Sequence, residues 1–379
     1  MPNALRTSLA IGAAAALAAL AGWSRSARPA ERPRAPAVTT PAATTPASEA
    51  TVPPSDPGRA TPPRATARPT DDDAPDLATA TGPRVSHAGS RRKPRVTPAV
   101  ERDDPAAFPP LPPPGPMDWL AVHPEDGQSF EAFRVAPRRQ VTEARRTLRV
   151  LPLDDLAAAG ADVPTITAYL AAFYGLPSEP GAATAPATFT TRVNPSTNRT
   201  QVLTTDVLRW LPGEVASTDY CVLALTTRDL YPSPSWNFVF GEAALVEGVG
   251  VFSFARMDPR FPWPPDPARR DAAEALLVKR RCLKVVSHEV GHMFGLEHCV
   301  ERRCLLNGCN HVAEMDATPM HLCPACLRKV VHATGLDVDA RYRALLAWYR
   351  REGLDDEAAW VERRIAARAA PPPAAATDR

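Results

Sequence analysis

The stretch VVSHEVGHMFGLEHCVERRCLLNGC, residues 285–309, carries two kinds of metal-ligand residue side by side. It contains three histidines in the pattern HExxHxxGxxH, and a cysteine follows the last of them directly. Imidazole nitrogens and thiolates both bind zinc, but catalytic sites and closed structural sites use them in different sets. The succession of His298 and Cys299 therefore indicates two separate metal sites that meet on one short segment.

The three histidines suit a zinc site with an open position. Residues four apart lie about 40° from each other around a helix axis, so His288 and His292 project from one face, one turn apart. Glu289 is offset by about 100° and can reach a water on the metal, which makes it a candidate general base. Gly295 permits a left-handed turn that brings His298 to the same ion. Three neutral nitrogen ligands and one open position are typical of a catalytic zinc.

Four cysteines form two pairs that suit a second zinc. Cys299 and Cys304 are a CxxxxC pair, and Cys323 and Cys326 in LCPACL are a CxxC pair. This spacing predicts a tetrahedral thiolate zinc that ties the loop after the histidine helix to a helix beginning near Cys323. Two disulfides are the alternative in an oxidising compartment. A zinc on these thiolates would also hold His298 in place.

The remaining cysteines and histidines of the domain have no comparable spacing. Cys221 and Cys282 fall in apolar stretches, and we expect them to be buried small hydrophobic residues. Cys309 has no assigned role. Three further histidines are expected to be surface residues or supports of the ligands: His311, His321 and His332.

The composition divides the chain into four parts. Half of its 44 prolines lie between residues 24 and 116, in a stretch with almost no aromatic residues. Such a stretch cannot bury enough apolar surface to offset the entropy of ordering. We therefore predict a disordered linker at 23–116, a folded domain at 117–369 and a disordered tail at 370–379. Residues 1–22 are a signal-like apolar segment with small residues at a candidate cleavage site.

The N-terminal segment predicts export. Its Ala/Leu run at 9–22 is short for a membrane span, so a secretory signal is preferred and the protein would be secreted or periplasmic. Positive charge directly after the run, at Arg25, Arg28, Arg32 and Arg34, opposes translocation. An uncleaved membrane tether through 9–22, or a cytoplasmic location, is the alternative. The net charge of +2 argues against a nucleic-acid partner.

Apolar periodicity predicts an α+β fold. Runs of β-branched and aromatic residues predict strands at 147–153, 220–225, 236–240 and 248–255. Apolar residues at helical spacing predict helices at 163–175, 268–295, 338–353 and 356–370. The order indicates a small twisted mixed sheet, a long active-site helix that carries the histidines, and a helical C-terminal part.

Taken together, these residues resemble the archaemetzincins, a family of metzincin-like zinc metallopeptidases, and in particular its longer animal-type members. The resemblance covers roughly residues 117–350. Beyond the motif it rests on four segments: DWLAVHPEDGQSFEAF (118–133), LTTRDLYPSPSWNFVFGEA (225–243), GVGVFSFAR (248–256) and LCPACLRKV (322–330). It implies a zincin or metzincin-like fold and a catalytic zinc on His288, His292 and His298 with Glu289 as general base. It also implies a second zinc on the four paired cysteines.

At one position the chain departs from this family. Metzincins place a methionine in a turn beneath the catalytic zinc, and Leu306 in CLLNG stands where the family has that methionine. Leucine and methionine have similar volumes and replace each other at modest cost in packing. We therefore expect the apolar floor of the site to be retained.

These features predict a zinc-dependent peptidase that hydrolyses peptides or proteins with two zinc ions, one catalytic and one structural. The alternative is a zinc-stabilised peptide-binding or scaffold protein with little turnover; Glu289 argues against it and Leu306 weakly for it. A redox role for Cys323 and Cys326 ranks third, because two partner cysteines lie nearby and no thioredoxin-like context surrounds them. Residues 236–240, or a neighbouring strand, are expected to pair with an extended substrate.

Overall fold

The histidine-bearing helix α5 (Ala272–Met293) is the element on which the candidate site is built. It begins at Asp271, whose carboxylate accepts a hydrogen bond from the Glu274 backbone N–H at 2.8 Å. The Glu274 side chain accepts in return from the Asp271 backbone N–H, so the two form a capping box. Beyond the helix, Gly295 has a φ of 86° and the chain turns away. The helix predicted within 268–295 is confirmed.

The computed structural model describes residues 8–11, 100–101, 104–182, 188–263 and 266–370. Contacts divide the chain into two units, Met1–Gly22 with Thr97–Arg379 and Trp23–Val96, and every described residue belongs to the first. None of the helices in these described ranges is both long enough and apolar enough to span a membrane.

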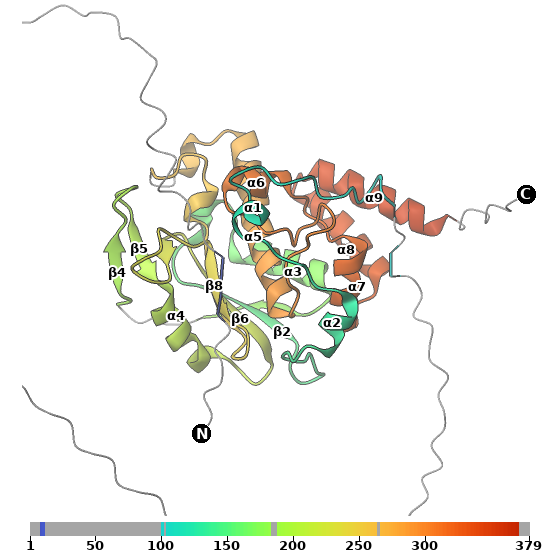
Figure 1. The fold of residues 1–379 in the computed structure, drawn as a ribbon, viewed down its shortest axis with the longest axis horizontal. Helices are drawn as coiled ribbons and strands as arrows, with labels where there is room; N and C mark the ends of the chain where they lie inside the picture. Colours follow the sequence, from blue (N-terminus) through green and yellow to red (C-terminus); the bar gives the residue numbers. More distant parts are fainter. Residues whose placement is uncertain (1–7, 12–99, 102–103, 183–187, 264–265, 371–379) are drawn as a thin grey trace, which may run out of the picture. The chain divides into compact units, whose positions relative to one another are not determined.

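Within the described residues, six strands form the main sheet, which is mixed (Figure 1). Their order across the sheet is β1 (Ser8–Ile11), β8 (Gly241–Ala244), β9 (Val249–Ser253), β6 (Asp219–Thr226), β2 (Thr147–Pro152) and β3 (Ser178–Pro180). Strands β9, β6, β2 and β3 run parallel, β8 is antiparallel to β9, and β1 is antiparallel to β8. Every residue of β6 is buried, as expected for a central parallel strand. The strands predicted at 147–153, 220–225 and 248–255 are confirmed.

A second, three-stranded sheet lies outside the predicted pattern. Its order is β4 (Thr191–Val193), β5 (Thr200–Leu203) and β7 (Asp229–Tyr231), with β4 antiparallel and β7 parallel to β5. These strands have three or four residues each, too few for an alternating pattern to be distinguished from a loop. The fold is therefore mixed α and β with two mixed sheets, and its zincin or metzincin-like character stays a prediction.

The strand predicted at residues 236–240 is wrong. Only Val239 forms a bridge there, to Leu230, and the regular strand β8 begins afterwards at Gly241. The carbonyl of Asn237 accepts instead from the side-chain amides of Asn194 and Gln201, both at 2.9 Å. These side-chain donors satisfy the backbone where a ladder partner would otherwise be needed. Pairing of an extended substrate with residues 236–240, or with a neighbouring strand, stays a prediction.

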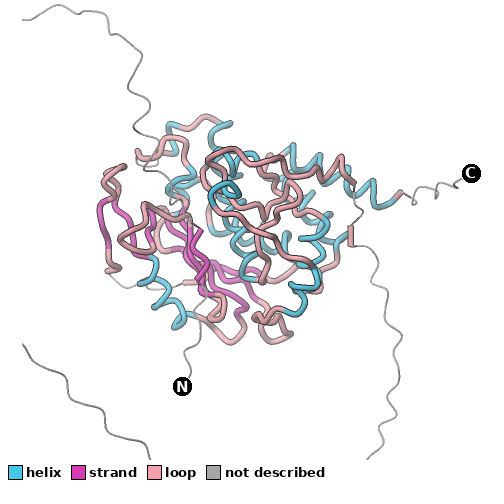
Figure 2. Tube along the Cα trace, viewed as in Figure 1, coloured by secondary structure: helices cyan, strands magenta, loops and turns pink. Residues whose placement is uncertain are grey.

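Helices are the other regular elements of the described chain. The α-helices besides α5 are α1 (Trp119–Val122), α2 (Phe130–Val135), α3 (Val163–Tyr174), α4 (Thr204–Trp210), α6 (Val312–Ala317), α7 (Pro324–Thr334), α8 (Val338–Arg351) and α9 (Asp355–Ala369). Short 3-10 helices are η1 (Leu156–Ala159), η2 (Leu211–Glu214), η3 (Ala255–Met257) and η4 (Pro267–Arg269). Figure 2 shows the strands gathered on one side of the view and the C-terminal helices on the other. The predicted helices at 163–175, 338–353 and 356–370 are confirmed as α3, α8 and α9.

Two buried tyrosines attach α5 to the rest of the domain. The Tyr220 hydroxyl on β6 donates to the Met293 carbonyl at 2.8 Å, and its ring stacks on Phe294 at a centroid distance of 4.7 Å. The Tyr174 hydroxyl at the end of α3 donates to the Ser287 carbonyl. A buried hydroxyl that finds a backbone acceptor costs little and restricts the elements that it joins. The helix that carries the histidines is thus held between the sheet and α3.

Part of the segment assigned to the linker from its composition packs against the domain. Phe108 is completely buried, and its carbonyl accepts from the Arg302 guanidinium at 2.8 Å. Glu101 pairs with Arg364 at 2.8 Å on α9. An isolated aromatic residue in a proline-rich stretch has no periodicity that would mark it as core. The domain limits as a whole stay a prediction, because 1–7, 12–99 and 371–379, and with them most of the signal-like segment, lie outside the described residues.

Candidate metal centre

The structure brings the three histidines of the motif together. His288 and His292 project from one face of α5, and their Nε2 atoms lie 3.0 Å apart. His298 reaches them from the chain beyond Gly295, and the ligand nitrogens of all three lie within 4.8 Å of one another. The local period of the helix and the left-handed turn at the glycine therefore produce the cluster together.

Each of these histidines uses its Nδ1 atom for a bond to oxygen. His288 Nδ1 donates to the Leu305 carbonyl at 2.8 Å, and His292 Nδ1 donates to the Leu296 carbonyl at 2.6 Å. His298 Nδ1 lies 2.9 and 3.0 Å from the two carboxylate oxygens of Glu125. A carbonyl or carboxylate oxygen can only accept, so the proton sits on Nδ1 and the Nε2 lone pair is left for a metal.

The environment keeps the imidazoles of His288 and His292 in the neutral form that metals bind. Burial, together with the neighbouring His298, lowers the pKa of His288 to about 3. Burial and the other two histidines hold the pKa of His292 well below its ordinary value. His298 Nε2 is buried and has no hydrogen-bond partner among the described residues. Tetrahedral zinc with Zn–N bonds of about 2.0–2.1 Å would separate its nitrogen ligands by roughly 3.4 Å, so the cluster fits such an ion.

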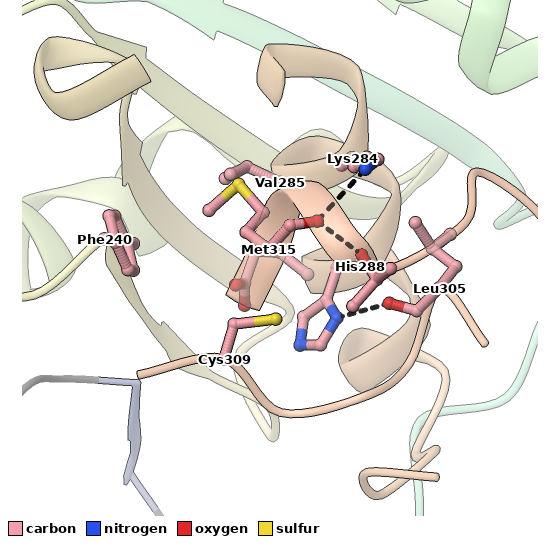
Figure 3. Close-up of a pocket in the computed structure, with 9 residues that line it drawn as sticks. Phe240, Lys284, Val285, His288, Leu305, Cys309 and Met315 are labelled. Carbon is pink, nitrogen blue, oxygen red and sulfur yellow. Dashed lines mark hydrogen bonds between the residues drawn. The ribbon is translucent and has the colours of Figure 1, made fainter. Parts of the chain in front are cut away.

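Glu289 lies beside the histidines at a pocket. Its carboxyl is buried, and burial raises its pKa to about 8. Figure 3 shows the pocket, with the Cys309 sulfur pointing toward the His288 ring. Cys309, for which the sequence indicated no role, thus lines this pocket. The nine residues that line the pocket are Phe240, Lys284, Val285, His288, Glu289, Leu305, Cys309, Met315 and Thr318.

The four paired cysteines form a second cluster. The sulfur atoms of Cys299, Cys304, Cys323 and Cys326 lie within 4.8 Å of one another, and those of Cys299 and Cys323 are 3.7 Å apart. All seven cysteines of the chain are described, and each is a free thiol. With Zn–S bonds of about 2.3 Å, sulfurs in a tetrahedral zinc site lie roughly 3.8 Å apart. The cluster therefore fits a closed zinc site better than the two disulfides.

The loop between Cys304 and Asn307 touches both clusters. Cys304 belongs to the sulfur cluster, and the next residue, Leu305, supplies the carbonyl that holds His288. Leu306 is completely buried against α5: a Cβ built on Gly291 would lie 3.0 Å from one of its methyl carbons. Leu306 thus occupies an apolar position beside the histidine helix. The Asn307 side chain donates to the Cys299 carbonyl at 2.6 Å and braces the loop.

Two residues of the site were not predicted from the sequence as functional. Glu125 accepts from His298 and also from the Trp119 indole N–H at 2.7 Å. The Trp119 ring meets the His298 ring edge-on at 5.0 Å. Burial would raise the pKa of Glu125, but its interaction with His298 and the hydrogen bond from Trp119 outweigh burial and lower that pKa. Both residues lie in the segment 118–133, which supported the family resemblance but has no spacing that relates it to the motif.

The remaining histidines and cysteines lie apart from the histidine cluster. The His311 side chain bridges to the Asp118 carboxylate at 3.1 Å, and with Glu314 these residues form a third, unpredicted group of possible ligands. Its members bond to one another and to the backbone, which gives each a structural role. His321 stacks on Trp360 at 3.7 Å. Cys221 and Cys282 are completely buried, as expected, in β6 and α5.

The comparison with known proteins points to one family. The model of Peptidase family M54 matches residues 211–332. Archaemetzincin-2 of Pongo abelii is 34% identical over 279 residues, which cover 65% of this chain and 76% of that protein. Archaemetzincin-2 of Homo sapiens is 34% identical over 280 residues, with the same two shares of 65% and 76%. The crystal structure of archaemetzincin from Methanopyrus kandleri is 26% identical with a TM-score of 0.40, over 52% of this chain and 99% of that one.

Proposed function

The chain belongs to the archaemetzincin family and is a zinc metallopeptidase, and we propose that Glu289 is its general base and that the clustered cysteines hold a second, structural zinc. One observation carries the first part. Three Nε2 atoms converge beside a buried carboxyl, while every Nδ1 atom of the three histidines is occupied by an oxygen acceptor. The described residues add no support for a redox role, or for the peptide-binding alternative beyond the weak argument from Leu306.

The reaction follows from the positions of these groups. His288, His292 and His298 would hold the catalytic zinc through Nε2. When bound, the ion supplies a Lewis acid for the scissile carbonyl and lowers the pKa of water toward neutrality. Glu289 takes a proton from the attacking water and passes it to the nitrogen of the leaving amine. The substrates are peptides or proteins.

The electrostatics of Glu289 suit both halves of this proton transfer. Burial raises its pKa to about 8, and the charge of a zinc ion held by the histidines would lower it again. A carboxyl balanced in this way accepts a proton and returns it near neutral pH, where general acid–base catalysis works best. An exposed glutamate at the ordinary pKa would be a weaker base toward the attacking water.

The second zinc would act on the structure of the site. Cys299 directly follows the ligand His298, and Cys304 directly precedes Leu305, which holds His288. A zinc on the four thiolates would fix the segment between these points and tie it to α7, which begins after Cys323. The second zinc would therefore help to position His288 and His298 and would take no part in the chemistry.

The test is a peptide-library digest with the full chain and Glu289→Gln. The amide has the shape of the carboxyl but cannot take the proton, so we expect a loss of hydrolysis of about 10²- to 10⁴-fold with unchanged metal content. Glu297→Gln, at an exposed side chain before His298, is the matched control and should cleave like the parent. Hydrolysis by the parent should stop on chelation and return with zinc. Cleavage by Glu289→Gln at the parental rate would refute the role of Glu289.

A further inference from the structure

His298 differs from the other two histidines in what holds its ring. His288 and His292 are in a helix and donate to backbone carbonyls, whereas His298 lies in the irregular chain after Gly295. Its Nδ1 partner is the carboxylate of Glu125, the one charged acceptor among the three. The ring orientation of His298 therefore depends on a side chain that is 173 residues away in the sequence.

The carboxylate is itself held in place by further bonds. One oxygen of Glu125 accepts from the Trp119 indole N–H at 2.7 Å and from His298 Nδ1 at 2.9 Å, and the second lies 3.0 Å from the same Nδ1. The His298 side chain is 4% exposed and that of Glu125 30% exposed. The bond thus lies at the edge of the protein interior, where a charge-assisted hydrogen bond keeps more of its strength than in water.

The segment that carries Glu125, residues 118–128, is held at its start by α6 and at its end by the histidine loop and α7; we call it the strap. At its start, the Trp119 backbone N–H donates to Glu314 at 2.9 Å. At its end, the Gln128 side-chain amide donates to the Gly295 carbonyl at 3.1 Å, and the Gln128 carbonyl accepts from Lys329. Fixed ends leave the carboxylate little freedom to follow a displaced ring, so the strap determines where the ring lies.

The packing of the strap also depends on the loop after the cysteines. A Cβ at Gly308 would overlap the Trp119 indole, so only glycine allows the ring to approach this closely. The same indole contacts the His298 ring and donates to Glu125. Two separate observations therefore place the strap against His298. One is the hydrogen bond to the Glu125 carboxylate, and the other is the close packing of the Trp119 indole on Gly308.

We infer that Glu125 is a positioning residue of the metal centre: it holds His298 in the Nδ1–H tautomer and directs its Nε2 atom toward the other two nitrogens. The inference rests on the proposed role of His298 as a zinc ligand. A carboxylate that accepts from a ligating imidazole fixes its orientation and makes it a stronger donor to the metal. The strap lies outside residues 211–332, so this support comes from beyond the part of the chain that matches the family model.

The experiment compares zinc affinity in the full-length parent, Glu125→Gln and Glu125→Ala. Competition with a chelator reports the histidine site, and cobalt substitution reports the thiolate site through its sulfur-to-metal charge-transfer band. Loss of the acceptor in Glu125→Ala should weaken zinc at the histidines by about 10- to 100-fold. Glu125→Gln keeps an acceptor without the charge, so its loss should be smaller. The matched control Glu131→Gln changes an exposed glutamate of α2 and should bind like the parent.

The outcomes separate positioning from a general structural role. A graded loss, parent then Gln then Ala, with the thiolate site unchanged supports the inference. An alanine variant that binds zinc at the histidines within about twofold of the parent overturns it, as does equal weakening of both sites. The zinc measurement does not depend on turnover. If Glu289→Gln still hydrolysed peptides while Glu125→Ala lost zinc, the proposed function would fail and this inference would stand.

Discussion

Leu306 offers the sharpest test of how the loop after the cysteines supports the histidine helix. Its side chain is completely buried, and a Cβ on Gly291 would lie 3.0 and 3.3 Å from its two methyl carbons. Leu306→Ala would leave a cavity against α5, which Tyr174 and Tyr220 hold in place, so the site cannot collapse easily. Buried Leu→Ala replacements cost about 2.7–5.0 kcal/mol, and a rigid wall favours the upper half, roughly 4 kcal/mol.

Leu306→Met provides the matched comparison at the same position. It conserves volume, and Gly291 has no Cβ to obstruct the longer chain, so we expect a cost below about 1.5 kcal/mol. The assay is denaturant-induced unfolding of the parent and both variants with zinc present at a fixed concentration. A cost under about 1 kcal/mol for Leu306→Ala, or equal costs for the two variants, would show that Leu306 does not support α5.

Two further predictions concern the second metal cluster and a buried ion pair. Cys304→Ser should weaken zinc binding at the histidines by about 10- to 100-fold, because the Leu305 carbonyl that holds His288 follows Cys304 directly. The control is Cys221→Ser, which changes a buried thiol outside the cluster. Equal zinc affinity of Cys304→Ser and the parent in a competition titration would exclude this coupling. At Asp258 burial would raise the pKa, but the hydrogen bond from Arg270 outweighs it and lowers the pKa below the ordinary 3.8. The folded state then binds fewer protons, so this pair stabilises above about pH 4 and the contribution is lost as the pH falls further. Asp258→Asn should cost about 3 kcal/mol at pH 7, and its difference from the parent in urea unfolding should shrink below pH 4; a difference independent of pH would contradict this reasoning.

Local geometry accounts for the part of the site that was predicted. His288 and His292 share a face because the helical period relates residues four apart, whatever the rest of the fold does. Gly295 can turn the chain because it lacks a Cβ, and its φ of 86° is such a turn. The CxxC at Cys323 likewise brings two thiols together within one turn. These are properties of short segments, so their residues are recognisable in the sequence.

The supports of the ligands are of a different kind. Glu125 meets His298 only because the strap folds back across the domain, and a single glutamate among many carries no period that would single it out. The carbonyl that holds His288 belongs to Leu305, whose side-chain type is irrelevant to that bond. Even residues 236–240, apolar enough for a strand, lose that conformation to side-chain donors from Asn194 and Gln201. The types and spacing of the metal ligands can be recognised within short segments of the sequence. Backbone acceptors and distant carboxylates meet the histidines only when tertiary packing closes the long loops between them.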